Sequence, residues 1–510
     1  MEISIDRNSS LPIYKQIRNQ LREQIVSGHL PPGFRLPPER KLADRLGVNR
    51  TTILNAYRDL RADGLIDARI GQGTVVNQPE TPSAITGRMD PSNVNSLPWR
   101  QLLSASATRM QQPLVGNILR SANRQQVISF AAGFSCATAE PLGELAETQQ
   151  RILRDHGSAT LQYSATEGHL PLRESLGALL EGRGSPATPD EVMVLAGSQQ
   201  GIDLAARILI DPGDLVLVEE PTFFAALQIF QSAGARVIGI PIDHHGLRVD
   251  LLEPLLKRYK PKFIYTVPTF QNPSGTVLSI NRRLQLLDLA YHYQIPIIED
   301  DAYAELRYEG TPVPPLKALD RHGYVIYLSS FSKVMFPGLR VGWVSASRPL
   351  LRQFGLAKQL ADLHTNTLGQ WIMDDLLRRG VYHRQVQAVR KGNHASLTRM
   401  TEAFNRHCLK AIEWRAPEGG LYFWCRLPQD FDAAMLAAQA EARGVIIVPG
   451  SIFYPAGGGE NEFRLSFASP APDQIETGVK TLMQAAKTLL GQDSPQNQTM
   501  ETPVEVRPIL

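Results

Sequence analysis

The chain has 510 residues, of which 43% are hydrophobic and 20% charged, as expected for a soluble globular protein with more than one domain. No apolar run is long enough for a membrane helix, and the polar start MEISIDRNSS lacks the apolar segment of a signal peptide, so no membrane partner is expected. Three widely spaced cysteines predict neither a disulfide framework nor a zinc site, so we expect no metal and a cytoplasmic location.

The net charge of +3 is unevenly distributed along the chain. Residues 1–76 contain 12 basic and 8 acidic residues, whereas the remainder is close to neutral. A basic excess confined to a small N-terminal region is what binding to a phosphate backbone requires. Solvated basic surfaces of this size are also common, so the charge indicates DNA binding only in combination with a sequence motif.

The first 77 residues predict three helices followed by a β-hairpin. Apolar residues recur every four positions from Ile13 to Ile25, and Gly28 ends this first helix. A rigid connector, HLPPGFRLPP, separates it from the second. The short β-like runs LIDAR and TVV surround a glycine-rich turn after the third helix. The helices are predicted over residues 11–27, 39–47 and 50–63, which together with the hairpin describe a winged helix-turn-helix over 1–77.

The rest of the chain predicts a linker and a large α/β domain. Residues 78–115 are rich in Ser, Pro, Asn and Gln and predict a linker with one short helix near its end. Over residues 116–490, buried-strand runs such as EVMVLAG, DLVLVEEP and IPIIEDD alternate with helical patterns, which predicts a mostly parallel sheet. The polar residues 491–510 predict a disordered tail.

Residues 32–76, PGFRLPPERKLADRLGVNRTTILNAYRDLRADGLIDARIGQGTVV, resemble the GntR family of winged-helix regulators. The Pro-Gly turn, the Leu-Pro-x-Glu-Arg helix start and the Gly-x-Gly wing carry the resemblance. It implies that double-stranded operator DNA is a partner, although a module kept only for dimer contacts is the alternative. The implied DNA contacts are Arg50, Thr51 and Thr52 at the start of the third helix, Arg40 at the start of the second, and Gly71 with Gly73 in the wing.

Two sets of side chains in this module are expected not to contact bases. Leu54 stands where related family members can carry a basic residue, which puts any base contact from that position in doubt. Apolar residues at helical spacing are expected to form the core instead. They are Leu42, Leu46, Ile53, Tyr57 and Leu60.

Residues 329–343, SSFSKVMFPGLRVGW, resemble the Schiff-base lysine segment of fold-type-I aminotransferases, and the resemblance extends over about 350 residues. It implies the pyridoxal-phosphate-dependent transferase fold, with a smaller C-terminal α/β subdomain and pyridoxal 5′-phosphate as cofactor. Lys333 is the implied catalytic residue, forming the internal aldimine with the cofactor aldehyde. Ser330, Ser332 and Arg340 are implied to bind the phosphate.

Other motifs of the same family supply further cofactor contacts. The run LAGSQQGIDL resembles the phosphate-binding turn, where Ser198 and Gln199 would offer backbone amides at a helix N-terminus. The run IPIIEDDAYAEL holds three adjacent acids, Glu299, Asp300 and Asp301, which the residues alone do not rank. The family places a tyrosine three residues beyond the aspartate that faces the pyridine nitrogen, so Tyr303 selects Asp300.

The resemblance also assigns contacts to the pyridine ring, the substrate and a second subunit. Tyr303 and Asn272 would contact the 3′ oxygen of the ring, and Phe223 would stack on its face unless it is simply a core residue. Tyr163 matches a tyrosine that reaches the phosphate of the neighbouring subunit, which implies a homodimer. Arg464 would bind the substrate α-carboxylate, and Gly133 would leave room for the substrate backbone.

A GntR-like head on an aminotransferase-like body resembles the MocR/GabR type of bacterial regulator. The resemblance implies a pyridoxal-phosphate-dependent transcription regulator that senses an amino compound or the cofactor itself. The alternative is an active aminotransferase carrying a DNA-binding module, because no residue of the catalytic set is missing. A non-catalytic sensor of free pyridoxal phosphate is a third interpretation.

Overall fold

The computed structural model describes residues 3–6, 12–62, 65–69, 73–77, 102–110, 127–135 and 141–492. The chain divides into two compact units, Met1–Pro98 and Trp99–Leu510. Each unit has its own apolar core, so each is described by itself. Of the predicted segments, Gly71 in the wing, residues 78–101 and 111–115 of the predicted linker, and residues 493–510 of the predicted tail lie outside the described residues. Residues 491 and 492, predicted as part of that tail, are instead the last turn of a helix.

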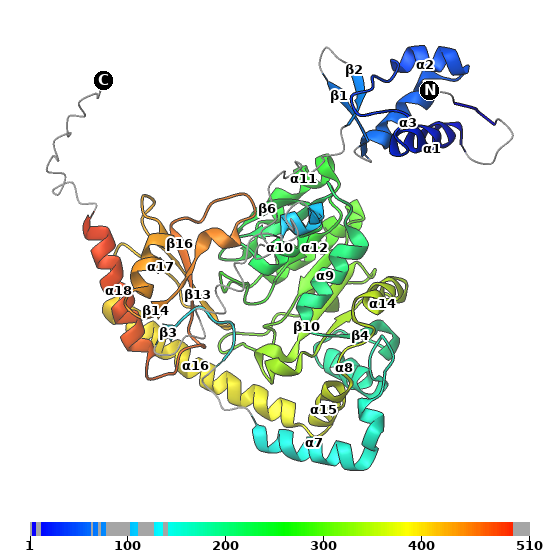
Figure 1. The fold of residues 1–510 in the computed structure, drawn as a ribbon. Coiled ribbons are helices and arrows are strands. Elements are labelled where there is room, and N and C mark those ends of the chain that lie inside the picture. The colour runs from blue at the N-terminus through cyan, green and yellow to red at the C-terminus, as the bar shows by residue number, and fades with distance from the viewer. Residues whose placement is uncertain are drawn as a thin grey trace, which may run out of the picture. The chain divides into compact units, whose positions relative to one another are not determined.

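The first unit, the head, is a winged helix-turn-helix, as the sequence predicts. Its core is formed by the apolar face of the first helix, including the fully buried Ile17 and Leu21, packed on the other two helices. Gly47 ends the second helix in the left-handed conformation, with φ of 62°. The elements are α1 (Ile13–Val26), α2 (Glu39–Leu46), α3 (Arg50–Ala62), β1 (Ile66–Arg69) and β2 (Gly73–Val76), all shown in blue in Figure 1.

The connector before α2 is more than a spacer. The amide of Gly33 donates to the Val76 carbonyl (2.8 Å), Val76 donates back to Phe34 (2.9 Å), and the amide of Leu36 donates to Thr74 (2.9 Å). The Pro-Gly turn thus pairs with β2 and extends the β1–β2 hairpin. Sequence reasoning treated this segment only as rigid, because the pairing is between residues about 40 positions apart.

The second unit, the body, contains an eight-stranded sheet in the order β4-β11-β10-β9-β8-β5-β6-β7. From β10 to β6 the neighbouring strands are parallel, which confirms the predicted mostly parallel sheet. Strand β11, which the sequence analysis did not single out, runs antiparallel to both its neighbours. The strands are β4 (Val192–Leu195), β5 (Leu215–Glu220), β6 (Arg236–Asp243), β7 (Gly246–Leu247), β8 (Ile264–Thr266), β9 (Ile297–Asp300), β10 (Val325–Ser330) and β11 (Gly342–Ser345).

Both faces of this sheet are covered. Val216 and Val218 of β5 belong to one apolar cluster, whereas Leu215 and Leu217 belong to another. Burial on both faces explains why these strands read as continuous apolar runs. The surrounding helices are α7 (Leu142–His156), α8 (Leu170–Glu181), α9 (Ser198–Leu209), α10 (Phe224–Ser232), α11 (Leu252–Tyr259), α12 (Ile280–Tyr293), α13 (Leu316–Leu319), α14 (Arg348–Asp362) and α15 (Thr367–Arg378) (Figure 1).

A smaller C-terminal lobe completes the body. Its four-stranded sheet has the order β12-β13-β16-β15, and the long helix α16 packs against α18 beside it (Figure 1). Strand β3 (Ile128–Ser129) pairs with β14 (Val445–Ile446) and so brings the chain around Gly133 into this lobe. The other elements are β12 (Glu413–Trp414), β13 (Tyr422–Arg426), β15 (Val448–Pro449), β16 (Glu462–Ser466), α16 (Val381–His407), α17 (Ala433–Glu441) and α18 (Ile475–Gln492).

A short helix, α5 (Ala105–Arg109), lies within the segment predicted as linker. The Ser106 hydroxyl and the Arg109 Nε both donate to the Ser232 carbonyl at the end of α10, over 3.2 and 3.1 Å. This helix therefore docks on the body, and the division of the chain assigns it there. Within the described ranges, no helix is both long enough and apolar enough to cross a membrane.

Candidate active site and nucleic-acid interface

Lys333 lies just after β10, in the short helix η4 (Phe331–Lys333), at the carboxyl end of the parallel strands. Its amine donates to the Gly133 carbonyl (2.9 Å) and lies 5.8 Å from the centre of the Tyr303 ring. The β3–β14 pairing brings Gly133 to this position, although 200 residues separate it from Lys333 in the chain. The two residues that the sequence assigned to cofactor and substrate are therefore neighbours.

The structure separates the three adjacent acids after β9 by their surroundings. Glu299 accepts the amides of Leu316 and Lys317 (2.7 and 2.8 Å) and so caps α13. Asp300 accepts the Tyr265 hydroxyl (2.9 Å), and Asp301 accepts the Tyr327 hydroxyl (2.9 Å). The positive charge of Lys333 acts to lower the pKa of Asp300. This interaction favours Asp300 as the acid of the site.

One carboxylate oxygen of Asp300 can accept a further hydrogen bond. Its Oδ1 is buried without a hydrogen-bond partner among the described residues. Burial raises its pKa to about 6, while the Tyr265 hydrogen bond and Lys333 oppose that rise. Buried acceptors in native proteins are normally paired. A protonated ring nitrogen of pyridoxal phosphate would satisfy this oxygen and favour the ionised carboxylate.

Tyr303, Asn272 and Arg464 form a connected buried group. The Asn272 amide donates to the Tyr303 hydroxyl (3.2 Å), and the Arg464 Nη1 donates to the Asn272 Oδ1 (2.9 Å). The other terminal nitrogen of Arg464 donates to the Ala131 carbonyl (2.8 Å), and its Nε is buried without a partner among the described residues. Arg464 is only 3% exposed, so it is a desolvated cation that an anionic ligand would pair with.

The residues predicted to bind phosphate gather at the N-terminus of α9. Gly197 precedes this helix with φ of 96°, and a Cβ there would lie 2.5 Å from the Arg340 Nη2. Arg340 donates to the Ala196 carbonyl (2.8 Å) and approaches the Ser332 hydroxyl (3.4 Å), to which Ser330 donates (2.8 Å). A helix N-terminus, a guanidinium and two hydroxyls are the donor set that a phosphate requires.

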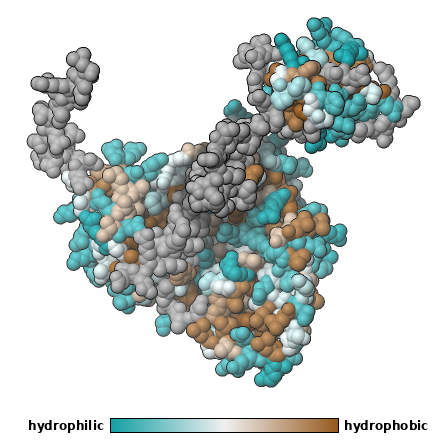
Figure 2. Space-filling view, viewed as in Figure 1, coloured by the Kyte–Doolittle hydropathy of each residue, from teal (hydrophilic) through white to brown (hydrophobic). Residues whose placement is uncertain are grey.

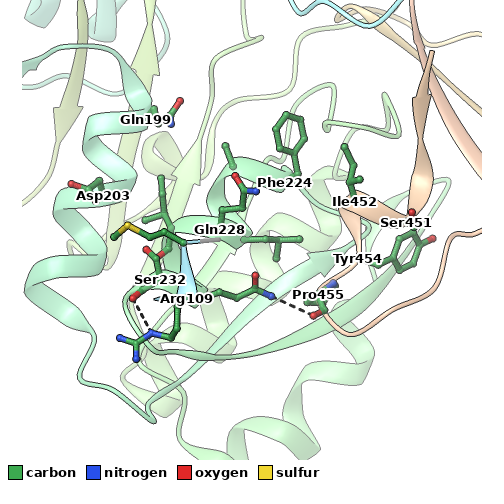
Figure 3. Close-up of a pocket in the computed structure, with 15 residues that line it drawn as sticks. Arg109, Gln199, Asp203, Phe224, Gln228, Ser232, Ser451, Ile452, Tyr454 and Pro455 are labelled. Carbon is green, nitrogen blue, oxygen red and sulfur yellow. Dashed lines mark hydrogen bonds between the residues drawn. The ribbon is translucent and has the colours of Figure 1, made fainter. Parts of the chain in front are cut away.

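Two other predicted cofactor residues lie beside this group. Gln199, in the first turn of α9, lines a cavity of about 510 Å³ that is also lined by residues of α10, by Ser451, Ile452, Tyr454 and Pro455, and by Arg109 at the end of α5 (Figure 3). Phe223 is half-buried immediately before α10 and packs against an apolar cluster that contains Ala131. Gln199 therefore contributes to the lining of this cavity. Its predicted contact with the phosphate is made by the backbone amide and not by the side chain.

Sequence reasoning missed Tyr422. This buried residue begins β13, and its hydroxyl lies 3.4 Å from that of Tyr303. The Arg464 guanidinium lies 4.2 Å from the centre of its ring. Burial raises the pKa of Tyr422, but the charges of Arg464 and Lys333 outweigh this and lower it overall. The alternation in YFWCR and EFRLS was the available signal, since it places Tyr422 and Arg464 on the same face if the strands pair.

Tyr163 does not join the site within one chain. Its side chain is 84% exposed and contacts His364 edge-on, with 5.7 Å between the ring centres. Hydrophobic side chains gather over the lower part of the body in Figure 2, where α7 and α15 lie in Figure 1. Exposed apolar residues on or next to α7 are Leu142, Leu153 and Leu161. The predicted contact of Tyr163 therefore requires a second subunit.

The predicted DNA contacts of the head lie at the starts of α2 and α3. Arg40, Arg50 and Thr51 are exposed and Thr52 is half-buried. The amide of Thr51 donates to the Asn49 side chain (2.9 Å), which fixes the first turn of α3, and Arg50 pairs with Glu39 (3.2 Å). Leu54 is 43% exposed on the same helix. Of the predicted core residues, Leu42, Ile53, Tyr57 and Leu60 are buried and Leu46 packs against them.

Comparisons with known proteins match both units. Residues 13–76 match the model of bacterial regulatory proteins of the gntR family, and residues 125–482 match that of class I and II aminotransferases. An uncharacterised HTH-type transcriptional regulator of Bacillus subtilis, YisV, is 31% identical, with 95% of this chain and 98% of the relative covered. The probable rhizopine catabolism regulatory protein MocR of Rhizobium meliloti is 28% identical, with 94% of this chain and 95% of the relative covered.

Among solved structures, the body is similar to the α-aminoadipate aminotransferase LysN of Thermus thermophilus, which was determined with N-(5′-phosphopyridoxyl)-L-leucine. The identity is 37%, the TM-score is 0.73, and 78% of this chain and all of the other are covered. Fold and site together define a class I and II aminotransferase domain joined to a gntR-type head. The chain belongs to the family of HTH-type transcription regulators with this fusion, the MocR type.

Proposed function

We propose that this regulator senses an amino compound, or pyridoxal phosphate itself, through its body and changes the DNA binding of its head in response. The observation that carries the proposal is the group of residues around Lys333 in a chain that also has the head. The group includes a buried acid whose Oδ1 has no partner among the described residues, the glycine turn before α9 with Arg340 beside it, and a buried arginine. Such a site gives an amine a chemically specific way to alter the body.

The residues present fit pyridoxal phosphate. Lys333 would hold its aldehyde, Asp300 would accept from its ring nitrogen, and Asn272 with Tyr303 would contact its 3′ oxygen. Ser198, Gln199, Ser330, Ser332 and Arg340 would bind its phosphate, with Phe223 against the ring. When bound, the cofactor supplies an aldehyde that reacts with amines and a ring that accepts electrons. Arg464 would orient a ligand by its carboxylate, and Gly133, whose carbonyl accepts from the Lys333 amine, would leave room for the ligand backbone.

Exposed apolar side chains on the body support a homodimer. Leu161 is 66% exposed and lies two residues before Tyr163, which is 84% exposed, and Leu360 on α14 is 89% exposed. Exposed apolar surface can mark an interaction site. A second copy would cover it and would bring Tyr163 to the neighbouring phosphate site. Leu360→Glu is expected to lower the molar mass measured by light scattering to that of a monomer and to weaken cofactor binding.

For the head, we propose that Arg40, Arg50, Thr51 and Thr52 contact the operator, with Gly71 allowing the wing to approach a groove. The exposed start of α3 supports this, because polar and basic side chains there are free to reach phosphates and base edges. Arg50 pairs with a carboxylate in the free protein and would exchange that partner for DNA.

Aminotransferase turnover is the second candidate function. The retained Lys333, Asp300 and Arg464 favour it, and so does the 37% identity to LysN over the whole length of that enzyme. Turnover would not contradict sensing, because a regulator can convert its effector slowly. The two functions differ in whether the ligand state of the body changes DNA binding.

The decisive experiment measures operator affinity in three states of the full-length protein. An operator selected in vitro is titrated with the apo protein, the cofactor-loaded protein and the loaded protein saturated with candidate amino acids. We expect affinity to change by about 5- to 150-fold, which corresponds to a coupling free energy of about 1–3 kcal/mol. Arg464→Ala should remove the response to carboxylate-bearing amines and keep the cofactor absorption band. Identical affinity in all three states would contradict sensing and favour the enzyme.

A further inference from the structure

Tyr422 lies between the two groups that would meet opposite ends of an amino acid. On one side is Lys333, where an amine would bind, and on the other is Arg464, where a carboxylate would bind. A Cβ built on Gly133 would lie 2.6 Å from the Tyr422 hydroxyl and 3.5 Å from the Lys333 amine. The hydroxyl and the amine therefore border the same small space beside Gly133.

The ring of Tyr422 is one of three supports of the Arg464 side chain. Two of them are hydrogen bonds, to the Asn272 side chain and to the Ala131 carbonyl. The third is aromatic, with the guanidinium 4.2 Å from the centre of the Tyr422 ring and 5.2 Å from that of Phe453. A guanidinium over an aromatic face is attracted to it and has its plane restricted.

The strand pairing makes the arrangement rigid. In the antiparallel pair of β13 and β16, Arg464 is opposite Trp424 and Tyr422 is opposite Ser466. Tyr422 is therefore the diagonal neighbour of Arg464 on the same face of the small sheet. Both side chains are almost completely buried, at 2% and 3% exposure, so neither has solvent into which it could turn.

We infer that Tyr422 is a positioning residue for Arg464, whose ring holds the guanidinium toward a ligand carboxylate and so makes the site select α-amino acids over amines without a carboxylate. The inference rests on the proposed binding of amines at Lys333. It predicts that discrimination depends on the aromatic ring of residue 422, because the ring contacts the guanidinium. The hydroxyl contacts Tyr303 and is not required for that discrimination.

The test uses the full-length, cofactor-loaded protein and two ligands of the same shape, L-leucine and 3-methylbutylamine, which lacks the carboxylate. The shift of the cofactor absorption band gives a dissociation constant for each. In the wild type we expect leucine to bind more tightly. Tyr422→Leu should weaken leucine binding about tenfold or more and change amine binding less than about twofold. Tyr422→Phe is the matched control, keeps the ring, and should keep the discrimination to within about threefold.

Other outcomes decide against the inference. The inference is overturned if Tyr422→Leu leaves the affinity for both ligands unchanged. It is also overturned if the variant loses affinity for both ligands equally. Equal losses would indicate general damage to the protein, which the cofactor stoichiometry and the thermal midpoint would also detect. A wild type that binds the cofactor but prefers neither ligand would overturn it as well. A wild type that takes up no cofactor would instead contradict the proposed function.

Discussion

The head and the body place their functional residues in opposite ways. In the head, the predicted contacts outside the wing lie within 13 residues, from Arg40 to Thr52, and most are exposed. In the body, the group around Lys333 is assembled from residues between Gly133 and Arg464, and its charged members Asp300 and Arg464 are at least 95% buried. An exposed contact can be changed with little effect on the fold, whereas a buried charge is linked to stability. Substitutions at the predicted contacts of the head should therefore change DNA binding with little effect on stability, whereas substitutions of the buried charges of the body should change stability as well as ligand binding.

The largest expected effect is in the body. Lys333→Ala should abolish borohydride-stable incorporation of pyridoxal phosphate, because the amine that would hold the aldehyde is absent. The measurement is the stoichiometry of labelled protein by mass spectrometry, and basal operator binding by the same variant is the control. Labelling at full stoichiometry in the variant would show that another lysine holds the cofactor.

Asp300→Asn tests the link between this site and stability. Burial raises the Asp300 pKa from 3.8 to about 6, so the folded apo protein holds this proton more tightly than the unfolded chain does. The resulting stabilisation is complete below about pH 4 and is lost as the pH rises through about 6. At pH 8 the apo Asn variant should therefore exceed the wild type in free energy of unfolding, by up to about 3 kcal/mol.

Urea unfolding of both apo proteins at pH 4, 6 and 8 measures this difference. The two should be close at pH 4, where Asp300 is protonated. The Asn variant should nevertheless bind the cofactor more weakly at pH 8, because it lacks the negative charge opposite the ring nitrogen. A stability difference that does not vary with pH would contradict the assignment of an ionised, buried Asp300.

In the head, Arg50→Ala should weaken operator binding by about 1–3 kcal/mol if the side chain reads a base, and equally on all sequences if it contacts only phosphate. The cofactor absorption band and the thermal midpoint of the body should not change, because Arg50 is 69% exposed and lies in the other unit. Fluorescence anisotropy on operator and unrelated DNA separates the two cases. Wild-type affinity on the operator would remove Arg50 from the interface.

The smallest expected effect comes from the partner of Arg50. Glu39→Gln removes an exposed ion pair of 3.2 Å, and such pairs contribute between about 0 and 1 kcal/mol. Operator affinity should rise by less than about threefold, because Arg50 no longer has to leave a carboxylate. A loss of affinity larger than that of Arg50→Ala would show that Glu39 positions α2 rather than restraining Arg50.

The sequence predicted most of both units where the determinants are local. The helices of the head follow from apolar spacing and glycine ends, and the parallel strands of the body follow from apolar runs. Strand β11 gave no separate signal, because its sequence, Gly342–Ser345, is short and begins inside the lysine motif. Its antiparallel direction depends on its two neighbours, which no local pattern encodes.

The site shows the same limit. Glu299, Asp300 and Asp301 could not be ranked from the residues alone, since their roles depend on Leu316, Tyr265 and Tyr327, which lie elsewhere in the chain. The family resemblance supplied Asp300, and the charge of Lys333 acting on its pKa supports it. An unpaired Oδ1 does not separate the two aspartates, because both have one among the described residues. Tyr422 had no motif of its own, because it meets Arg464 only through the pairing of β13 with β16.

The docking of α5 on the Ser232 carbonyl gives the body a fixed point early in its chain. From Asn77, the last described residue of the head, about 30 residues lead to Ser106, and a covalent chain of that length spans at most about 100 Å. The two hydrogen bonds from Ser106 and Arg109 to one carbonyl therefore set an upper limit on the distance between Asn77 and the end of α10.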